Sequence, residues 1–202
     1  MEETKNDYES KKREREYARE EESKRVRMAK AKKSLLRYAL WLIIVAIIGY
    51  GIFLLAQTAV PEGEDFSVAY DIQGRDHIAD GEKRSVYNSN PPSSGPHYGS
   101  TVRGGFYDEP LPDEQVIHNL EHGDIWIAYH PHISDKAKEK LKSFAGRYVV
   151  VSPRLENEGD ISLVAWGRVD TFDINNEIVD EGRIRDFIRR YDNRGPEKVR
   201  GR

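Results

Sequence analysis

The sequence has 202 residues, a formal net charge of −3 at pH 7 and no cysteine. The small net charge, together with the lack of a basic stripe interleaved with aromatic residues, argues against a nucleic-acid partner. The lack of cysteine excludes disulfides, thiol redox chemistry, cysteine-ligated zinc and cysteine nucleophiles. A folded domain in this chain must therefore depend on its hydrophobic core.

The N-terminal part changes abruptly in composition. Residues 1–37 are almost wholly charged and polar, and we expect them to form a solvated helix or a disordered arm. Residues 38–56 contain no charged side chain, and about 20 apolar residues suffice for a helix to cross a bilayer. A buried helix in a globular protein of this size would keep a polar face, which this run lacks. We therefore predict one transmembrane helix over residues 38–58.

Charged residues on the two sides of the span predict its orientation. Basic residues precede the span and acidic residues follow it: Lys24, Arg25, Arg27, Lys30, Lys32, Lys33 and Arg37 before, Glu62, Glu64 and Asp65 after. The positive-inside rule places residues 1–37 in the cytoplasm and residues 60–202 outside the cell membrane. A cleaved signal peptide fits poorly, because its n-region would be far too long and the apolar run exceeds a typical h-region. We predict an uncleaved signal anchor.

The part beyond the span begins with irregular structure. We expect three regions: a linker at 59–69, an extracytoplasmic α+β domain at 70–192 and a polar tail at 193–202. Weak strand character over residues 66–78 precedes a stretch, residues 87–99, in which three prolines and two glycines exclude regular structure. The tyrosines and His97 of this stretch are atypical of disorder. We expect an ordered loop with a function.

The rest of the domain alternates between helix and strand signals. A short helix is expected over residues 114–122, with Asp113 as its N-cap and Gly123 as its terminator. Residues 124–130 predict a strand that is apolar on both faces and therefore central. The next element is a helix over 135–145, capped by Ser134 and ended by Gly146. Two strands follow, over 147–152 and 161–169, with a turn at 157–160 between them. The last helix runs from Asn175 or Asn176 to Tyr191. The expected fold is an α+β domain with a small mixed sheet: a long Pro/Gly loop and a short helix, then β-α-β-β-α.

The histidines predict a metal site. All six lie beyond the span, at positions 77, 97, 118, 122, 130 and 132. His118 and His122 are four residues apart, so on a helix their imidazoles lie on one face and can share a metal ion. Glu121, between them, is either a third ligand or a carboxylate beside a metal-bound water. We expect His97, in the rigid loop, to supply another imidazole and His77 to be a further ligand.

Other conspicuous side chains have simpler interpretations. His130 and His132 lie where the central strand ends, and we expect them at the surface. Trp126 and Trp166 lie within predicted strands, and we expect them to be core aromatic residues.

A hydrolase is a disfavoured alternative. The letters His118-x-x-Glu121-His122 match the inverted zinc-protease signature, but the predicted helix has fewer than three turns. Acidic residues of the last helix could supply a third ligand, yet they are better explained as its solvated face: Glu177, Asp180 and Glu181. Ser93 and Ser94 lie near His97, but the sequence has no Gly-x-Ser-x-Gly elbow to mark a serine nucleophile.

A purely structural role is the second alternative. Glu121 could accept a hydrogen bond from His97 or from backbone amides of the Pro/Gly loop. The histidines would then form a polar clasp that holds the loop on the sheet. A domain of this kind would act as a protein-interaction module of the cell envelope.

Four stretches of the domain carry a resemblance to a known family: Asn-Ser-Asn-Pro-Pro-Ser-Ser-Gly-Pro-His-Tyr at 88–98, Gly-Phe-Tyr-Asp at 105–108, His-Asn-Leu-Glu-His-Gly at 118–123 and Ala-Trp-Gly-Arg at 165–168. They resemble an uncharacterised prokaryotic membrane-anchored family, number 3105 among the domains of unknown function. The resemblance covers residues 70–192, and Ser93 stands where the family often has threonine. It implies a single-anchored exported domain and no established activity. Its motif positions include His97, His118, Glu121 and His122.

The sequence favours a binding protein over an enzyme. The predicted ligands are His97, His118 and His122, with Glu121 and His77 as further candidates. Zinc or copper(II) suits imidazole ligands. Copper(I) is disfavoured, because the chain has no cysteine and its two methionines, Met1 and Met28, precede the span.

Overall fold

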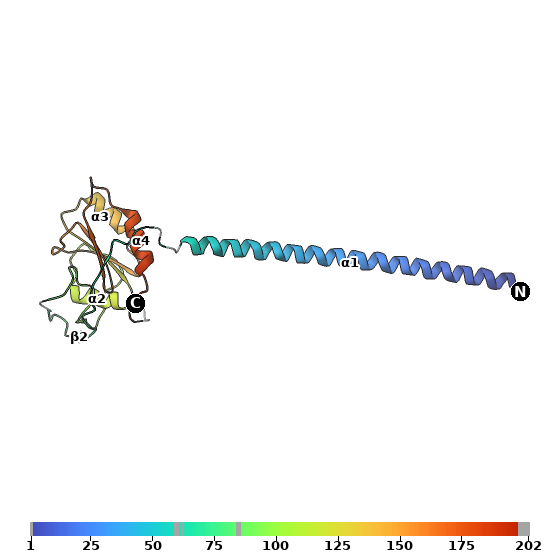
Figure 1. Ribbon diagram of the computed structural model, residues 1–202, viewed down its shortest axis with the longest axis horizontal. Helices are drawn as coiled ribbons and strands as arrows, with labels where there is room; N and C mark the ends of the chain where they lie inside the picture. The colour runs from blue at the N-terminus through green and yellow to red at the C-terminus, as the bar shows by residue number, and fades with distance from the viewer. Residues whose placement is uncertain (1, 59–60, 62, 84–85, 198–202) are drawn as a thin grey trace. The chain divides into compact units, whose positions relative to one another are not determined.

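The computed structural model describes residues 2–58, 61, 63–83 and 86–197 (Figure 1). The chain divides into two compact units, residues 1–59 and residues 60–202. Positions 59, 60 and 62 of the predicted linker and positions 198–202 of the predicted tail lie outside the described residues.

The first unit is one helix, α1 (Glu2–Thr58). Of the two alternatives predicted for the charged arm, a helix and a disordered segment, the structure has the helix. Oppositely charged residues four positions apart face each other on it, as where the Arg25 Nη2 lies 4.0 Å from the Glu21 Oε2. Within α1, the segment Arg19–Gln57 is long and apolar enough to cross a membrane. Its apolar side chains are largely exposed, with Leu42 and Leu55 each 71% accessible.

The second unit is built on a six-stranded mixed sheet. Its strands are β1 (Val68–Ala69), β4 (Gly105–Phe106), β5 (Ile125–Tyr129), β6 (Val149–Pro153), β7 (Ile161–Ala165) and β8 (Arg168–Phe172), in the order β1-β8-β7-β5-β6-β4. β5 pairs parallel with β6 and antiparallel with β7. All five residues of β5 are buried. The prediction of a central strand that is apolar on both faces is thus confirmed.

Helices cover both faces of this sheet. Side chains alternate along β5, so Ile125 and Ile127 join the core under α3 (Asp135–Lys142) and α4 (Glu181–Tyr191). Trp126 and Ala128 point the other way, into a second core with Val116 and Leu120 of α2 (Asp113–Glu121). In Figure 1, α2 accordingly lies across the sheet from α3 and α4. The predicted α+β class with a mixed sheet is confirmed.

Three local predictions need correction. The strand expected over residues 161–169 is two strands, β7 and β8, because the chain reverses at Gly167, whose φ of +70° suits glycine. α4 begins only at Glu181, where the Asp180 side chain accepts a hydrogen bond from the Arg183 N–H as its N-cap. Asn175 and Asn176 instead lie in the turn before it.

The third correction concerns α2. Pro112 occupies its N-cap position and Asp113 is its first helical residue. The Asp113 carboxylate instead accepts hydrogen bonds from Arg154, which directly follows β6. Of the two tryptophans, Trp126 is buried in the core, and Trp166 packs partly buried against the same cluster.

Candidate metal centre

Two histidines meet on a small parallel ribbon beside α2. The ribbon consists of β2 (His77–Ile78) and β3 (His97–Tyr98), with His77 in register with His97. The His97 N–H donates to the Asp76 carbonyl at 3.0 Å. The Pro/Gly loop therefore ends in a short strand, and this pairing brings together two imidazoles that lie 20 positions apart in the chain.

α2 adds an imidazole and a carboxylate to this pair. His118 and Glu121 are three residues apart on the helix, so both face the adjacent β3. One ligand atom from each of His77, His97, His118 and Glu121 lies within 4.8 Å of all the others. The rings of His77, His97 and His118 form a triangle with centroid separations of 5.0 to 5.1 Å. His77 is exposed and the other three residues are buried, so the group opens to solvent on the His77 side.

The protonation of His97 is constrained by its two neighbours. Its Nδ1 lies 2.8 Å from the Gly95 carbonyl oxygen, which can only accept, so Nδ1 carries a hydrogen. The Nε2 of a neutral ring then has a lone pair, yet it faces the Glu121 Oε2 at 3.0 Å. Both side chains are almost fully buried. Two electron-rich atoms in such a contact need a proton or a metal ion between them.

His118 is held in the neutral form that binds metals. Burial, followed by the positive charge of protonated His122, His97 and His77, lowers its pKa from 6.5 to about 4. Its Nδ1 is buried and has no hydrogen-bond partner among the described residues. A buried polar atom left unsatisfied in this way costs about 1–3 kcal/mol. In the tautomer with its hydrogen on Nε2, the Nδ1 has a lone pair that a bound cation would satisfy.

The second oxygen of Glu121 faces the solvent side. Its Oε1 lies 3.7 Å from the Nε of Arg75, whose side chain is 54% exposed. The Glu121 side chain is only 2% exposed, but solvent around the half-exposed arginine and the 3.7 Å separation keep this pair weak. The Glu121 carboxylate thus keeps its buried contact, with His97, as its main interaction.

His122 lies beside the group but outside it. Its ring packs against that of His118 with centroids 4.6 Å apart. Its Nε2 lies 3.0 Å from the Oε2 of Glu197, which belongs to the C-terminal segment (residues 193–197). The His-x-x-Glu-His stretch therefore gives two members of the four-residue group and one neighbour of it.

The other sequence candidates lie elsewhere. The rings of His130 and His132 pack against each other at a tilt, with centroids 4.1 Å apart, and the exposed His132 pairs with Asp160. Ser93 bonds to Ser89, so its hydroxyl has a structural role in the loop.

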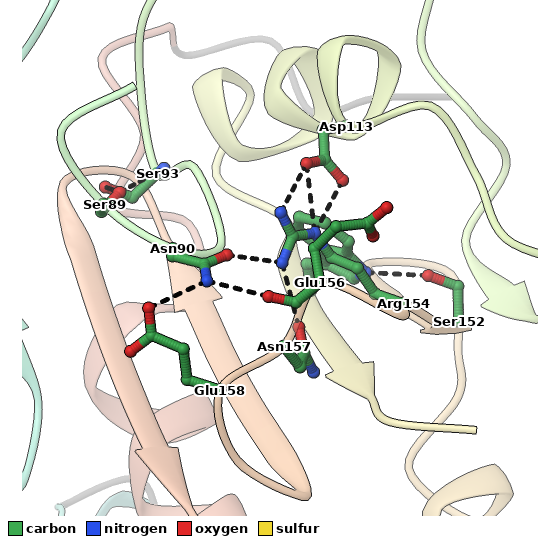
Figure 2. A network of polar contacts seen from close by, with 10 residues as sticks. Ser89, Asn90, Ser93, Asp113, Ser152, Arg154, Glu156, Asn157 and Glu158 are labelled. Atoms are coloured by element: carbon green, nitrogen blue, oxygen red, sulfur yellow. Dashed lines mark hydrogen bonds and ion pairs between the residues drawn. The ribbon is translucent and has the colours of Figure 1, made fainter. Parts of the chain in front are cut away.

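A buried arginine that sequence reasoning missed anchors the loop carrying His97. Arg154, at the end of β6, donates to both carboxylate oxygens of Asp113 and to the Asn90 Oδ1 at 2.6 Å (Figure 2). It also donates to Asn157. The Asn90 amide in turn donates to the backbone oxygen of Glu156. The network ties three segments to one guanidinium: the loop, the start of α2 and the end of β6.

Asn119 fixes the other side of α2. Its amide makes two bonds of 2.9 Å with the backbone N–H and C=O of Val102. It also donates to the Asp124 Oδ2. Asn119 lies between His118 and Leu120 and is itself buried, so these bonds set the rotation and depth of the helix that carries His118 and Glu121.

The comparisons with known proteins decide the family. The family model described as a protein of unknown function (DUF3105) matches residues 77–201. The chain belongs to the DUF3105 family. The matched region of the DUF3105 chain starts at His77 and includes the whole four-residue group and the C-terminal segment. No curated protein and no solved structure shows significant similarity to it.

The chemistry available to the DUF3105 domain follows from this donor set. Three imidazoles and one carboxylate are borderline ligands of the type that zinc and copper(II) accept. Ligands about 2.0–2.2 Å from a tetrahedral ion lie about 3.3–3.6 Å from one another. The group, with its 3.0 Å contact between His97 and Glu121 and a 4.8 Å limit overall, needs only small side-chain movements to reach that arrangement.

Proposed function

We propose that the DUF3105 chain is a single-pass membrane protein that exposes a metal-binding domain outside the cytoplasm. The ion, zinc or copper(II), is held by His77, His97, His118 and Glu121, with His122 adjoining. The observation that carries this proposal is the convergence of four ligand atoms within 4.8 Å in a largely buried group.

The electrostatics of the group support a bound cation. The His97 Nε2 lies 3.0 Å from the Glu121 Oε2, and the His118 Nδ1 is buried without a partner among the described residues. A divalent ion would satisfy both positions at once. The neighbouring rings also favour the neutral form of His118, because their positive charge when protonated lowers its pKa.

The placement in the membrane rests on α1 and its flanking charges. The segment Arg19–Gln57 is long and apolar enough to cross a bilayer. The basic residues before it and the acidic residues after it favour a cytoplasmic N-terminus and an external C-terminal domain. An uncleaved signal anchor in the cell membrane accounts for both features.

A structural clasp is the second candidate function, and one contact favours it. The Glu121 carboxylate and His97 are within hydrogen-bonding distance, and His97 also bonds to Gly95 within the loop. A protonated His97 would satisfy both contacts without any metal. In that case the DUF3105 domain would serve as an interaction module for a protein of the cell envelope.

Metal content separates the two functions. We expect the full-length chain, purified in detergent without chelators, to carry close to one zinc or copper ion per molecule by mass spectrometry. His118→Ala should lose the ion, because it removes a central imidazole. His130→Ala is the matched control, because it removes a histidine outside the group, and it should keep the ion.

Two results would overturn the metal-binding proposal. One is a metal-free protein whose melting temperature does not respond to added zinc or copper(II). The other is equal metal retention by the His118→Ala and control variants. Cleavage of peptides that Glu121→Gln abolishes would instead assign the disfavoured hydrolase function.

A further inference from the structure

We infer that the C-terminal segment, residues 193–197, is part of the metal centre, with Glu197 as the positioning residue that makes His122 a ligand. This inference rests on the proposed metal-binding function. It adds to that function a carboxylate from a region whose sequence indicates only a polar tail.

The segment is attached to the end of α2 by its backbone. The Asn193 N–H donates to the Gly123 carbonyl at 2.8 Å, and the Glu197 N–H donates to the Glu121 carbonyl at 3.2 Å. The residue whose carboxylate joins the four-residue group thus accepts a hydrogen bond from the tail through its main chain. The first contact holds Gly123, just beyond the end of α2, and the second holds the main chain of Glu121 itself.

Two glycines allow this close approach. A Cβ on Gly195 would lie 2.2 Å from the Glu121 carbonyl oxygen. A Cβ on Gly123, whose φ is +89°, would lie 2.9 Å from the Asn193 Cα. Real Cβ atoms do not come this close to backbone, so the segment and the helix end fit each other only with glycine at both positions.

The pairing of His122 with Glu197 sets the tautomer of the ring. The Glu197 carboxylate only accepts hydrogen bonds, so the His122 Nε2, 3.0 Å away, carries the hydrogen. The Nδ1 of the neutral ring then has the lone pair. This atom is buried and has no hydrogen-bond partner among the described residues.

Metal-binding histidines commonly show this arrangement. One ring nitrogen donates to a carboxylate or carbonyl oxygen, and the other binds the ion. His97 follows the same rule with the nitrogens exchanged, since its Nδ1 donates to Gly95 and its Nε2 faces the group. The His122 ring also packs on His118, with centroids 4.6 Å apart. His122 is thus prepared as a ligand at the edge of the group, and Glu197 holds it there.

The test uses cobalt(II) as the probe and the full-length chain in detergent. Affinity is measured by competition with a chelator, and the visible absorption bands of cobalt report the ligand set. Glu197→Gln keeps the shape of the side chain but can donate to the ring, which permits the wrong tautomer. We expect affinity to fall about 10-fold or more, with shifted cobalt bands and an unchanged stoichiometry.

Three further variants make the result specific. Glu197→Asp should restore part of the affinity, because it keeps the carboxylate. Glu177→Gln, which changes an exposed acidic residue outside the group, should leave affinity and bands unchanged. In the His122→Ala background, Glu197→Gln should have no additional effect on affinity, because Glu197 acts through that ring.

The outcomes distinguish this inference from the function on which it rests. Wild-type binding of one cobalt with unchanged affinity and bands in Glu197→Gln would overturn the role of Glu197 alone. If Glu197→Gln lowered the cobalt affinity of the His122→Ala variant as much as that of wild type, this role would also be overturned. Such a result would show that Glu197 acts independently of the His122 ring. A wild-type chain that binds neither cobalt nor zinc would overturn the metal-binding function itself.

Discussion

Replacing Arg154 by methionine should be among the most destabilising single changes in the domain. Arg154 is 7% exposed and its guanidinium donates to Asp113, Asn90 and Asn157. Arg154→Met keeps much of the apolar volume but leaves the Asp113 carboxylate without its cation. Removing one partner of a buried ion pair costs about 3–5 kcal/mol.

The expected cost lies at the lower end of this range. The Asp113 side chain is 23% exposed, so water can partly solvate the unpaired carboxylate. We therefore expect the free energy of unfolding to fall by about 3 kcal/mol. For a domain of this size that corresponds to a fall in melting temperature of about 12 °C.

Urea unfolding of residues 60–202 measures this change. That unit contains both hydrophobic clusters of the domain and the whole network. Arg103→Met, at an exposed arginine, is the matched control and should stay within about 0.5 kcal/mol of wild type. The double variant Asp113→Asn/Arg154→Met should recover part of the loss, because it leaves no buried charge unpaired. A cost below about 1 kcal/mol for Arg154→Met would refute the reasoning, because it would show that the network is not buried as described.

Three other predictions follow from the metal group and its helix. Zinc at about 100 times its dissociation constant should stabilise the domain by about 2.7 kcal/mol, seen as a raised melting temperature that His118→Ala abolishes; an equal rise in that variant would contradict the assignment. In metal-free protein the folded pKa of His118 is about 4 and its ordinary value is 6.5, so the unfolded chain binds the extra proton and the free energy of unfolding should fall as pH decreases from 6.5 to 4. Urea titrations at several pH values would show this slope, and His118→Gln should flatten it. Gly123→Ala should destabilise the domain by about 2 kcal/mol, because φ is +89° and a Cβ would meet the backbone of Asn193; a melting temperature equal to that of wild type would contradict the close packing.

Local pattern was sufficient to predict the main elements. The apolar run of β5 predicts a buried central strand, and Ser134 is the N-cap of α3, where it accepts a hydrogen bond from the Ala137 N–H. Hydrophobic periodicity and caps act over a few residues, so they are readable from sequence. The break between β7 and β8 was missed, because a single glycine, Gly167, reverses a stretch that is otherwise continuous in β-forming residues.

Contacts between distant segments were harder to predict. The helical spacing of His118 and Glu121 indicated a shared face, and the clasp alternative anticipated the contact of Glu121 with His97. No local pattern relates Asp113 to Arg154, which are 41 positions apart, or Glu197 to His122. Such pairs depend on how the sheet orders its strands. The sequence contains the side chains of these networks without indicating which of them meet.

The packing of residues 193–197 on α2 has a practical consequence for handling this protein. Glu197 lies five positions before Arg202 in the sequence. A purification tag or reporter fused to the C-terminus would therefore attach a few residues from a carboxylate that contacts His122. Fusions at the N-terminus, at the far end of α1 in sequence, avoid this part of the chain and are the better choice for metal analysis.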